Sequence, residues 1–285
     1  MDFRREQRAC PLWVPSDRKD HRAMAVTDEL YEFAFCYEPK NEELAALAAD
    51  EDWGPGLSIL KNYVIFPFKR AAQLQNRKES LGEGGAPYLL QTEEYACFDT
   101  GLYTDRYESI YALFVPNRRE NAQPWFLEGF FKTSDHALNE IPELPQRVRF
   151  TDNPADLIYD YRLPIRVNVD HILGDERNLE RIPEALRGDD QSFLLHRVFE
   201  GAVSEAERRA AANYMLAVPQ YYSGRIQLLL PLCLTSDEPE IALAIQRENG
   251  YYAGRTCLPL EWVYSNARLI ARPEASWIAP ANSAR

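Results

Sequence analysis

The hydrophobic period of this chain first changes at the glycine-rich segment of residues 82–85. Apolar residues recur at helical spacing before it, whereas beyond it they alternate with polar residues over Ser109–Val115 and Trp125–Lys132. Helical spacing returns over Ser204–Leu216 and Leu260–Leu269. Strands that follow one another without long crossovers pair antiparallel. The sequence therefore predicts an α+β fold, with N-terminal helices followed by a mostly antiparallel β-sheet and flanking helices.

Three helices are expected ahead of the glycine-rich segment. Thr27 is a good N-cap for the first, which should continue through Phe35, and Asn41 caps the second. The third should span residues 57–72 and end or kink at Pro67, because proline donates no backbone hydrogen bond. Further strands are expected at residues 95–98, 163–169, 225–234 and 240–247.

The change of period also predicts the domain organisation. Residues 1–26 are polar, mildly basic and without a sustained apolar period, which is typical of a mobile arm. Residues 27–81 are expected to form a helical N-terminal subdomain, and residues 86–285 the α+β main domain. No internal repeat is visible at the periods of solenoid proteins.

The charge balance limits the partners that this protein can bind. Lysine and arginine number 32 against 44 aspartates and glutamates, so the formal net charge is −12. Such a chain is not expected to bind bulk duplex DNA, because non-specific binding depends on neutralising many phosphates. A local basic pocket remains compatible with this charge.

Cysteine usage and hydropathy point to a soluble cytoplasmic protein. The five cysteines include no C-x-x-C pair, so neither a zinc ribbon nor a redox dithiol is indicated. The N-terminus lacks the apolar stretch of a signal peptide, and no apolar stretch is long enough to span a bilayer. No membrane partner is expected.

Ten short blocks of the sequence recur together in a known family. They are residues 32–35, 43–48, 51–53, 59–63, 98–102, 110–114, Asp160, 170–173, 255–259 and 262–270. In this succession the chain resembles the bacterial family called domain of unknown function 3825, from about Asp28 to Trp277. Members of that family occur alone or beside winged-helix modules of the LOTUS type, which are implicated in RNA binding. The resemblance therefore implies a link to nucleotides or RNA, and it settles no activity.

The triplet Asp99-Thr100-Gly101 raises the alternative of an aspartic-type hydrolase. That chemistry needs two carboxylates that share a proton, and the sequence has no second triplet. A tight turn, with Gly101 at positive φ, is the favoured interpretation. Thr100 stays in the set of candidate ligand-binding residues.

His171 is the candidate general acid or base, together with Asp170 and Asp160. It follows the expected strand at 163–169, and functional groups collect at the ends of such elements. A histidine that only caps a loop is the structural alternative. The three side chains also carry donor atoms suited to Mg²⁺ or Mn²⁺, although no metal-binding motif marks them.

Arginines near these residues suggest an anion pocket. Guanidinium groups bind phosphate in a bidentate manner, and the expected N-terminus of the helix after Pro259 also favours an anion. The candidate ligand-binding residues are Thr100, Arg166, Asn168, Arg255, Thr256, Asn266 and Arg268. A surface ion-pair lattice with nearby aspartates is the structural alternative.

Three functions are compatible with these residues. The leading hypothesis is a protein that binds a nucleotide or an RNA end and, in its catalytic form, hydrolyses a phosphoester or phosphoanhydride linkage. A non-catalytic module that recognises RNA or a signalling nucleotide is the main alternative. A purely structural interaction protein is the third.

Overall fold

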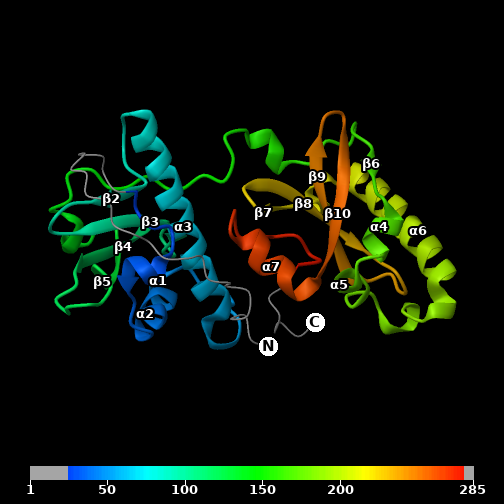
Figure 1. Ribbon diagram of the computed structural model, residues 1–285, viewed down its shortest axis with the longest axis horizontal. Helices are drawn as coiled ribbons and strands as arrows, with labels where there is room; N and C mark the ends of the chain where they lie inside the picture. The colour runs from blue at the N-terminus through cyan, green and yellow to red at the C-terminus, as the bar shows by residue number, and fades with distance from the viewer. Residues whose placement is uncertain (1–24, 279–285) are drawn as a thin grey trace, which may run out of the picture.

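The computed structural model describes residues 25–278, which form two five-stranded sheets with helices packed on them (Figure 1). The α+β class expected from the sequence is confirmed. The expected arm of residues 1–26 lies almost wholly outside the described residues. No helix among residues 25–278 is both long and apolar enough to cross a membrane.

The first sheet has the strand order β1-β5-β4-β3-β2. Its strands are β1 (Ala34–Phe35), β2 (Leu89–Gln91), β3 (Ala96–Tyr103), β4 (Ser109–Pro116) and β5 (Trp125–Lys132). All neighbours pair antiparallel except β1, which pairs parallel with β5. The helices α1 (Leu30–Phe33), α2 (Pro39–Leu47) and α3 (Ser58–Leu81) belong to this half.

The second sheet has the strand order β6-β10-β9-β8-β7. Its strands are β6 (Ile165–Arg166), β7 (Val218–Tyr222), β8 (Arg225–Leu232), β9 (Ile241–Glu248) and β10 (Tyr251–Pro259). Only β6, which pairs with β10, is parallel to its neighbour. Its helices are α4 (Val169–Leu173), α5 (Glu176–Leu179), α6 (Ser192–Ala212) and α7 (Leu260–Arg268).

The two halves therefore repeat one topology. In each half a two-residue strand is followed by helices and then by four antiparallel strands, the last of which pairs with the two-residue strand. In Figure 1, α3 and α7 lie between the two sheets, while α6 covers the far side of the second sheet. The sequence showed no such repetition, because the two halves share a strand order rather than a residue pattern.

Several helix boundaries differ from those expected. The first helix ends at Phe33, and the next two residues form β1 instead. α2 begins at Pro39, ahead of Asn41. α3 continues through Pro67 to Leu81, because burial of its apolar face against the first sheet offsets the hydrogen bond that proline cannot donate.

The structure also differs from the sequence expectation at the strand expected over 163–169 and at the helix expected over 204–216. Only Ile165 and Arg166 are in a strand, and Asn168 then caps α4 by accepting a hydrogen bond from the His171 N–H at 3.0 Å. α6 begins twelve residues earlier than expected and ends at Ala212. The loop at 82–85 connects α3 to β2, and both elements contribute to one apolar core.

Candidate functional site: an arginine cleft between the two halves

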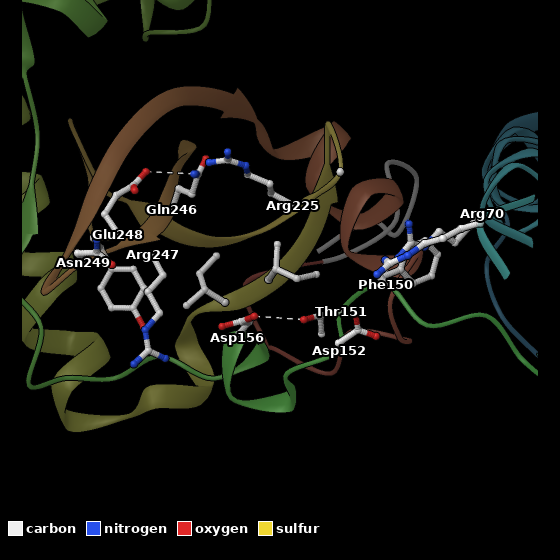
Figure 2. Close-up of a pocket in the computed structure, with 15 residues that line it drawn as sticks. Arg70, Phe150, Thr151, Asp152, Asp156, Arg225, Gln246, Arg247, Glu248 and Asn249 are labelled. Atoms are coloured by element: carbon white, nitrogen blue, oxygen red, sulfur yellow. Dashed lines mark hydrogen bonds between the residues drawn. The ribbon is translucent and has the colours of Figure 1, made fainter. Parts of the chain in front are cut away.

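A polar cleft of about 600 Å³ lies where α3, the linker between the two sheets and the ends of β8 and β9 meet (Figure 2). Four arginines line it, and we call it the arginine cleft. They are Arg70 and Arg77 from α3, Arg225 from the start of β8 and Arg247 from the end of β9. Figure 2 shows Arg70 and Phe150 on one side of the cleft, facing Arg225 and Gln246 on the other.

Arg70 is held in one orientation by contacts from the second half of the chain. Its Nε donates to the Arg149 carbonyl oxygen at 2.9 Å, and its Nη1 donates to the Tyr221 hydroxyl at 3.2 Å. Its guanidinium carbon lies 5.5 Å from the centre of the Tyr221 ring, which in turn packs against Phe150. Such fixation reduces the entropy that an arginine loses when it binds a ligand.

Arg77 and Arg225 carry uncompensated charge. Both side chains are exposed, and within residues 25–278 neither forms an ion pair or a side-chain hydrogen bond. Arg247 is half-exposed, and its Nη2 lies 3.6 Å from a carboxylate oxygen of Asp160. Two of the four cations are thus free to bind an anion without breaking an existing contact.

The acidic residues of the cleft already have partners. Asp152 pairs with Arg149 at 3.2 Å, and Asp156 accepts a hydrogen bond from the Thr151 hydroxyl at 3.1 Å. Glu248 pairs with Arg255. Because these carboxylates are engaged elsewhere, they neutralise Arg77 and Arg225 only at a distance.

A row of buried glutamines adjoins the cleft on the second sheet. Gln220, Gln227 and Gln246 stand on neighbouring strands and are each at least nine-tenths buried. Gln220 donates to Gln227 at 2.8 Å and accepts from Asn266 of α7 at 3.0 Å. Gln246 lines the cleft and donates to Glu248 at 3.1 Å. This row gives the cleft a polar wall of fixed amide groups.

The residues around the predicted general acid or base lie outside the cleft lining. His171 is exposed on α4, and no side-chain partner for it lies within the described residues. Asp170 is also exposed and lies 3.3 Å from His196 of α6. Asn168 caps α4, so the three residues share a helix rather than the face of a strand.

Asp160 and Arg166 are held apart by different partners. Asp160 accepts hydrogen bonds from Arg162, which lower the pKa of its carboxyl to about 2. A carboxylate with that pKa stays ionised near neutral pH and does not act as a general acid there. Arg166 stacks on Tyr251, with 4.5 Å from its guanidinium carbon to the ring centre.

Three of the other predicted ligand-binding residues hold the second half together. Arg255 pairs with Glu248, Thr256 donates to Asn178 at 2.7 Å, and Asn266 joins the glutamine row. Thr100 is fully buried in the first sheet, where its hydroxyl donates to the Ile110 carbonyl at 2.7 Å. The structure does not bring these side chains to a common partner.

Arg268 forms a buried ion pair. Its Nε lies 2.6 Å from a carboxylate oxygen of Glu51, and the side chains of Arg268 and Glu51 are 9% and 3% exposed. Its guanidinium carbon also lies within about 5 Å of the ring centres of Trp53 and Tyr63. Arg268 thereby fastens α7 to the first half instead of facing solvent.

Asp99 and Gly101 lie within β3, at an irregularity in its pairing with β4. Gly101 has a φ of +75°, as the sequence predicted, and a Cβ added there would lie 2.7 Å from the Tyr63 hydroxyl. Asp99 is 5% exposed, accepts a hydrogen bond from the Gly101 N–H at 2.7 Å, and has a pKa that burial raises to about 6. The triplet is a bulge inside a strand rather than a turn between strands.

Among the described residues, no group of three or more histidine, cysteine, aspartate or glutamate side chains is arranged to hold a metal ion. Asp160 is paired with Arg162, Asp170 lies beside His196, and the side chain of His171 is exposed on α4. The part of the chain that the structure describes therefore offers no ready-made protein cage for Mg²⁺ or Mn²⁺.

The sequence contained one signal for the cleft. Arg70 and Arg77 are seven residues apart, which places them on the same face of a long helix, two turns from each other. The partnership of this face with Arg225 and Arg247 depends on the packing of the two halves. No periodicity in the sequence encodes that packing.

A comparison with known protein families confirms the resemblance that the ten sequence blocks indicated. The family described as Domain of unknown function (DUF3825) matches residues 44–277, so the chain belongs to this family. The chain matches no curated protein and no solved structure at a significant level.

Proposed function

We propose that this protein binds a nucleotide or an RNA end through a phosphate group held in the arginine cleft. The observation that carries the proposal is the pair of exposed and unpaired arginines, Arg77 and Arg225, beside the fixed Arg70. In a chain with a net charge of −12, such a cluster lowers its own electrostatic free energy by binding an anion. Phosphate suits the forked geometry of guanidinium groups.

Binding without turnover is the form of the proposal that the cleft supports best. The described residues that line the cleft include no histidine, and its carboxylates Asp152, Asp156 and Glu248 each have a partner. A side-chain general base for hydrolysis would have to be one of these carboxylates, each of which already accepts a hydrogen bond or forms an ion pair. The recognition module is therefore preferred over the hydrolase.

The test compares RNA that differs only at its 5′ end. We expect single-stranded RNA with a 5′-phosphate to raise the melting temperature, because a ligand that binds only the folded state stabilises it. The same RNA with a 5′-hydroxyl should raise it less. Equal shifts for the two RNAs, or no shift with either, would contradict the proposal.

Product analysis separates binding from catalysis. Incubation of the protein with 5′-triphosphorylated RNA and with free nucleotides, with and without Mg²⁺, is expected to leave them unchanged. Release of phosphate or pyrophosphate, lost in the Arg225→Ala variant, would show that the hydrolase is the correct form of the proposal.

A further inference from the structure

We infer that the arginine cleft holds two consecutive phosphates of a single-stranded RNA rather than the phosphate of one nucleotide. This inference rests on the proposed function and specifies its ligand. The geometry that carries it is the placement of Arg70 and Arg77 along one wall of the cleft.

The two arginines of α3 mark two separate anion positions. Seven residues separate them, so their backbones lie about 10 Å apart along the helix axis. Arg70 cannot swing toward Arg77 without losing its bonds to the Arg149 carbonyl and the Tyr221 hydroxyl. A phosphate seated on Arg70 leaves Arg77, two turns further along the helix, in a position to meet a second anion.

The wall opposite α3 adds a second pair of cations. Arg225 lies at the start of β8 and Arg247 at the end of β9, and both line the same cleft. Two cations on each wall match a strand whose backbone runs between the walls. Electrostatic grooves that follow a phosphate backbone are typical of proteins that bind single-stranded nucleic acid.

Phe150 supplies a place for a base. It lies in the linker, lines the cleft next to Arg70 and is only partly buried, with Tyr221 packed against its ring at 4.9 Å between centroids. The other aromatic residue of the lining, Tyr252, is 1% exposed and offers no free face. Stacking on an aromatic ring tolerates any base, which fits the recognition of a strand end without sequence preference.

The amide of Gln246 gives the cleft one fixed polar group besides its charges. This side chain is 8% exposed and lines the cleft, and its Nε2 is already used by Glu248. Within the described residues its Oε1 has no partner, so it can accept a hydrogen bond from a ligand hydroxyl or amino group. An inorganic polyphosphate offers neither a ring for Phe150 nor such a donor for Gln246.

The experiment titrates adenosine 5′-monophosphate (AMP), adenosine triphosphate (ATP) and the 5′-phosphorylated RNA dinucleotide of adenosine (pApA) against the full chain by calorimetry. We expect pApA to bind at least tenfold more tightly than either mononucleotide. The Arg77→Ala variant should lose that advantage, because the substitution weakens the binding of pApA by tenfold or more and that of AMP much less. Phe150→Leu should weaken AMP and pApA severalfold and leave inorganic triphosphate unaffected.

Arg208→Ala is the matched control, because Arg208 is likewise exposed and unpaired on a long helix, α6, among the described residues. It should bind all ligands as wild type does. ATP that binds as tightly as pApA, or an Arg77→Ala variant that weakens AMP and pApA equally, would overturn the two-phosphate inference. Absence of binding by any of the ligands would instead reject the proposed function itself.

Discussion

The inner faces of the two sheets differ although the sheets share one topology. In the first half this face is aromatic: Phe98 and Phe114 of the sheet form a cluster with Phe33 of α1 and Phe68 of α3, with ring centroids 4.9 to 6.1 Å apart. In the second half the equivalent side carries the glutamine row and borders the arginine cleft. One strand order thus serves two purposes: the first half supplies an aromatic core, and the second presents polar groups beside it.

Removing an aromatic side chain from the first sheet is expected to have the largest effect. Phe114 is 1% exposed and contacts both Phe33 and Phe98, so Phe114→Ala should lower the free energy of unfolding by about 3–5 kcal/mol. Chemical denaturation measures this loss. The control is Phe193→Ala, because Phe193 is 75% exposed and its loss should be nearly neutral. A small loss for Phe114→Ala would show that the aromatic cluster does not stabilise the first half.

Breaking the ion pair between Arg268 and Glu51, which joins the two halves, is expected to have the second-largest effect on stability. Arg268→Ala leaves the carboxylate of Glu51 buried without its cation, which should cost about 3–5 kcal/mol. The double variant Glu51→Leu/Arg268→Met removes both charges and should recover most of that loss. Equal instability of the single and double variants would mean that packing, and not the stranded charge, dominates at this contact.

Asp99 predicts a pH dependence confined to the first half. Burial raises the pKa of its carboxyl from 3.8 to about 6, so the folded state binds more protons than the unfolded state between these values. Stability should therefore fall as the pH rises from about 4 to about 6, by at most about 3 kcal/mol. Asp99→Asn keeps an acceptor for the Gly101 N–H and should flatten this part of the curve. Thermal melts between pH 4 and pH 6 measure this dependence. If stability falls as steeply with pH in Asp99→Asn as in wild type, Asp99 is not its cause.

The glutamine row should contribute less to stability. Gln220→Ala leaves the amides of Gln227 and Asn266 without their partner, and we expect a loss of about 1–3 kcal/mol in urea denaturation. Gln73→Ala is the control, because this glutamine is exposed on α3 and, among the described residues, its side chain donates only to Asp28. A loss at Gln220 as large as that at Phe114 would remove the distinction between the two inner faces.

The strands β4 and β5 were easier to predict from the sequence than the end of α3 or the start of α6. The expected bounds of β5 are confirmed, and those of β4 differ by one residue, because turns rich in Asp, Asn and Gly delimit both strands. The end of α3 was wrong because tertiary burial of its apolar face outweighed the local effect of Pro67. The start of α6 was visible in principle, since Leu195, Phe199 and Ala206 continue its helical period.

The candidate site was less accessible to sequence reasoning. Arg70 and Arg225 are more than 150 residues apart, and only the packing of α3 near β8 places them in one cleft. Arg268 was selected for its charge, and its pairing with Glu51 depends equally on tertiary structure. Local signals did identify the conformation of Gly101, whose positive φ is a property of the backbone itself.

The affinity of the arginine cleft for a phosphorylated RNA end tests the central claim most directly. Fluorescence anisotropy with a 3′-labelled, 5′-phosphorylated single-stranded RNA would compare wild type, Arg225→Ala and Arg208→Ala. Arg225 is exposed and unpaired, so its removal should leave stability within about 0.5 kcal/mol of wild type. The loss of one charge-assisted contact should nevertheless weaken binding by about 1.5–3 kcal/mol, at least tenfold. Arg208→Ala should bind as wild type does, and equal affinities for all three proteins would contradict the account.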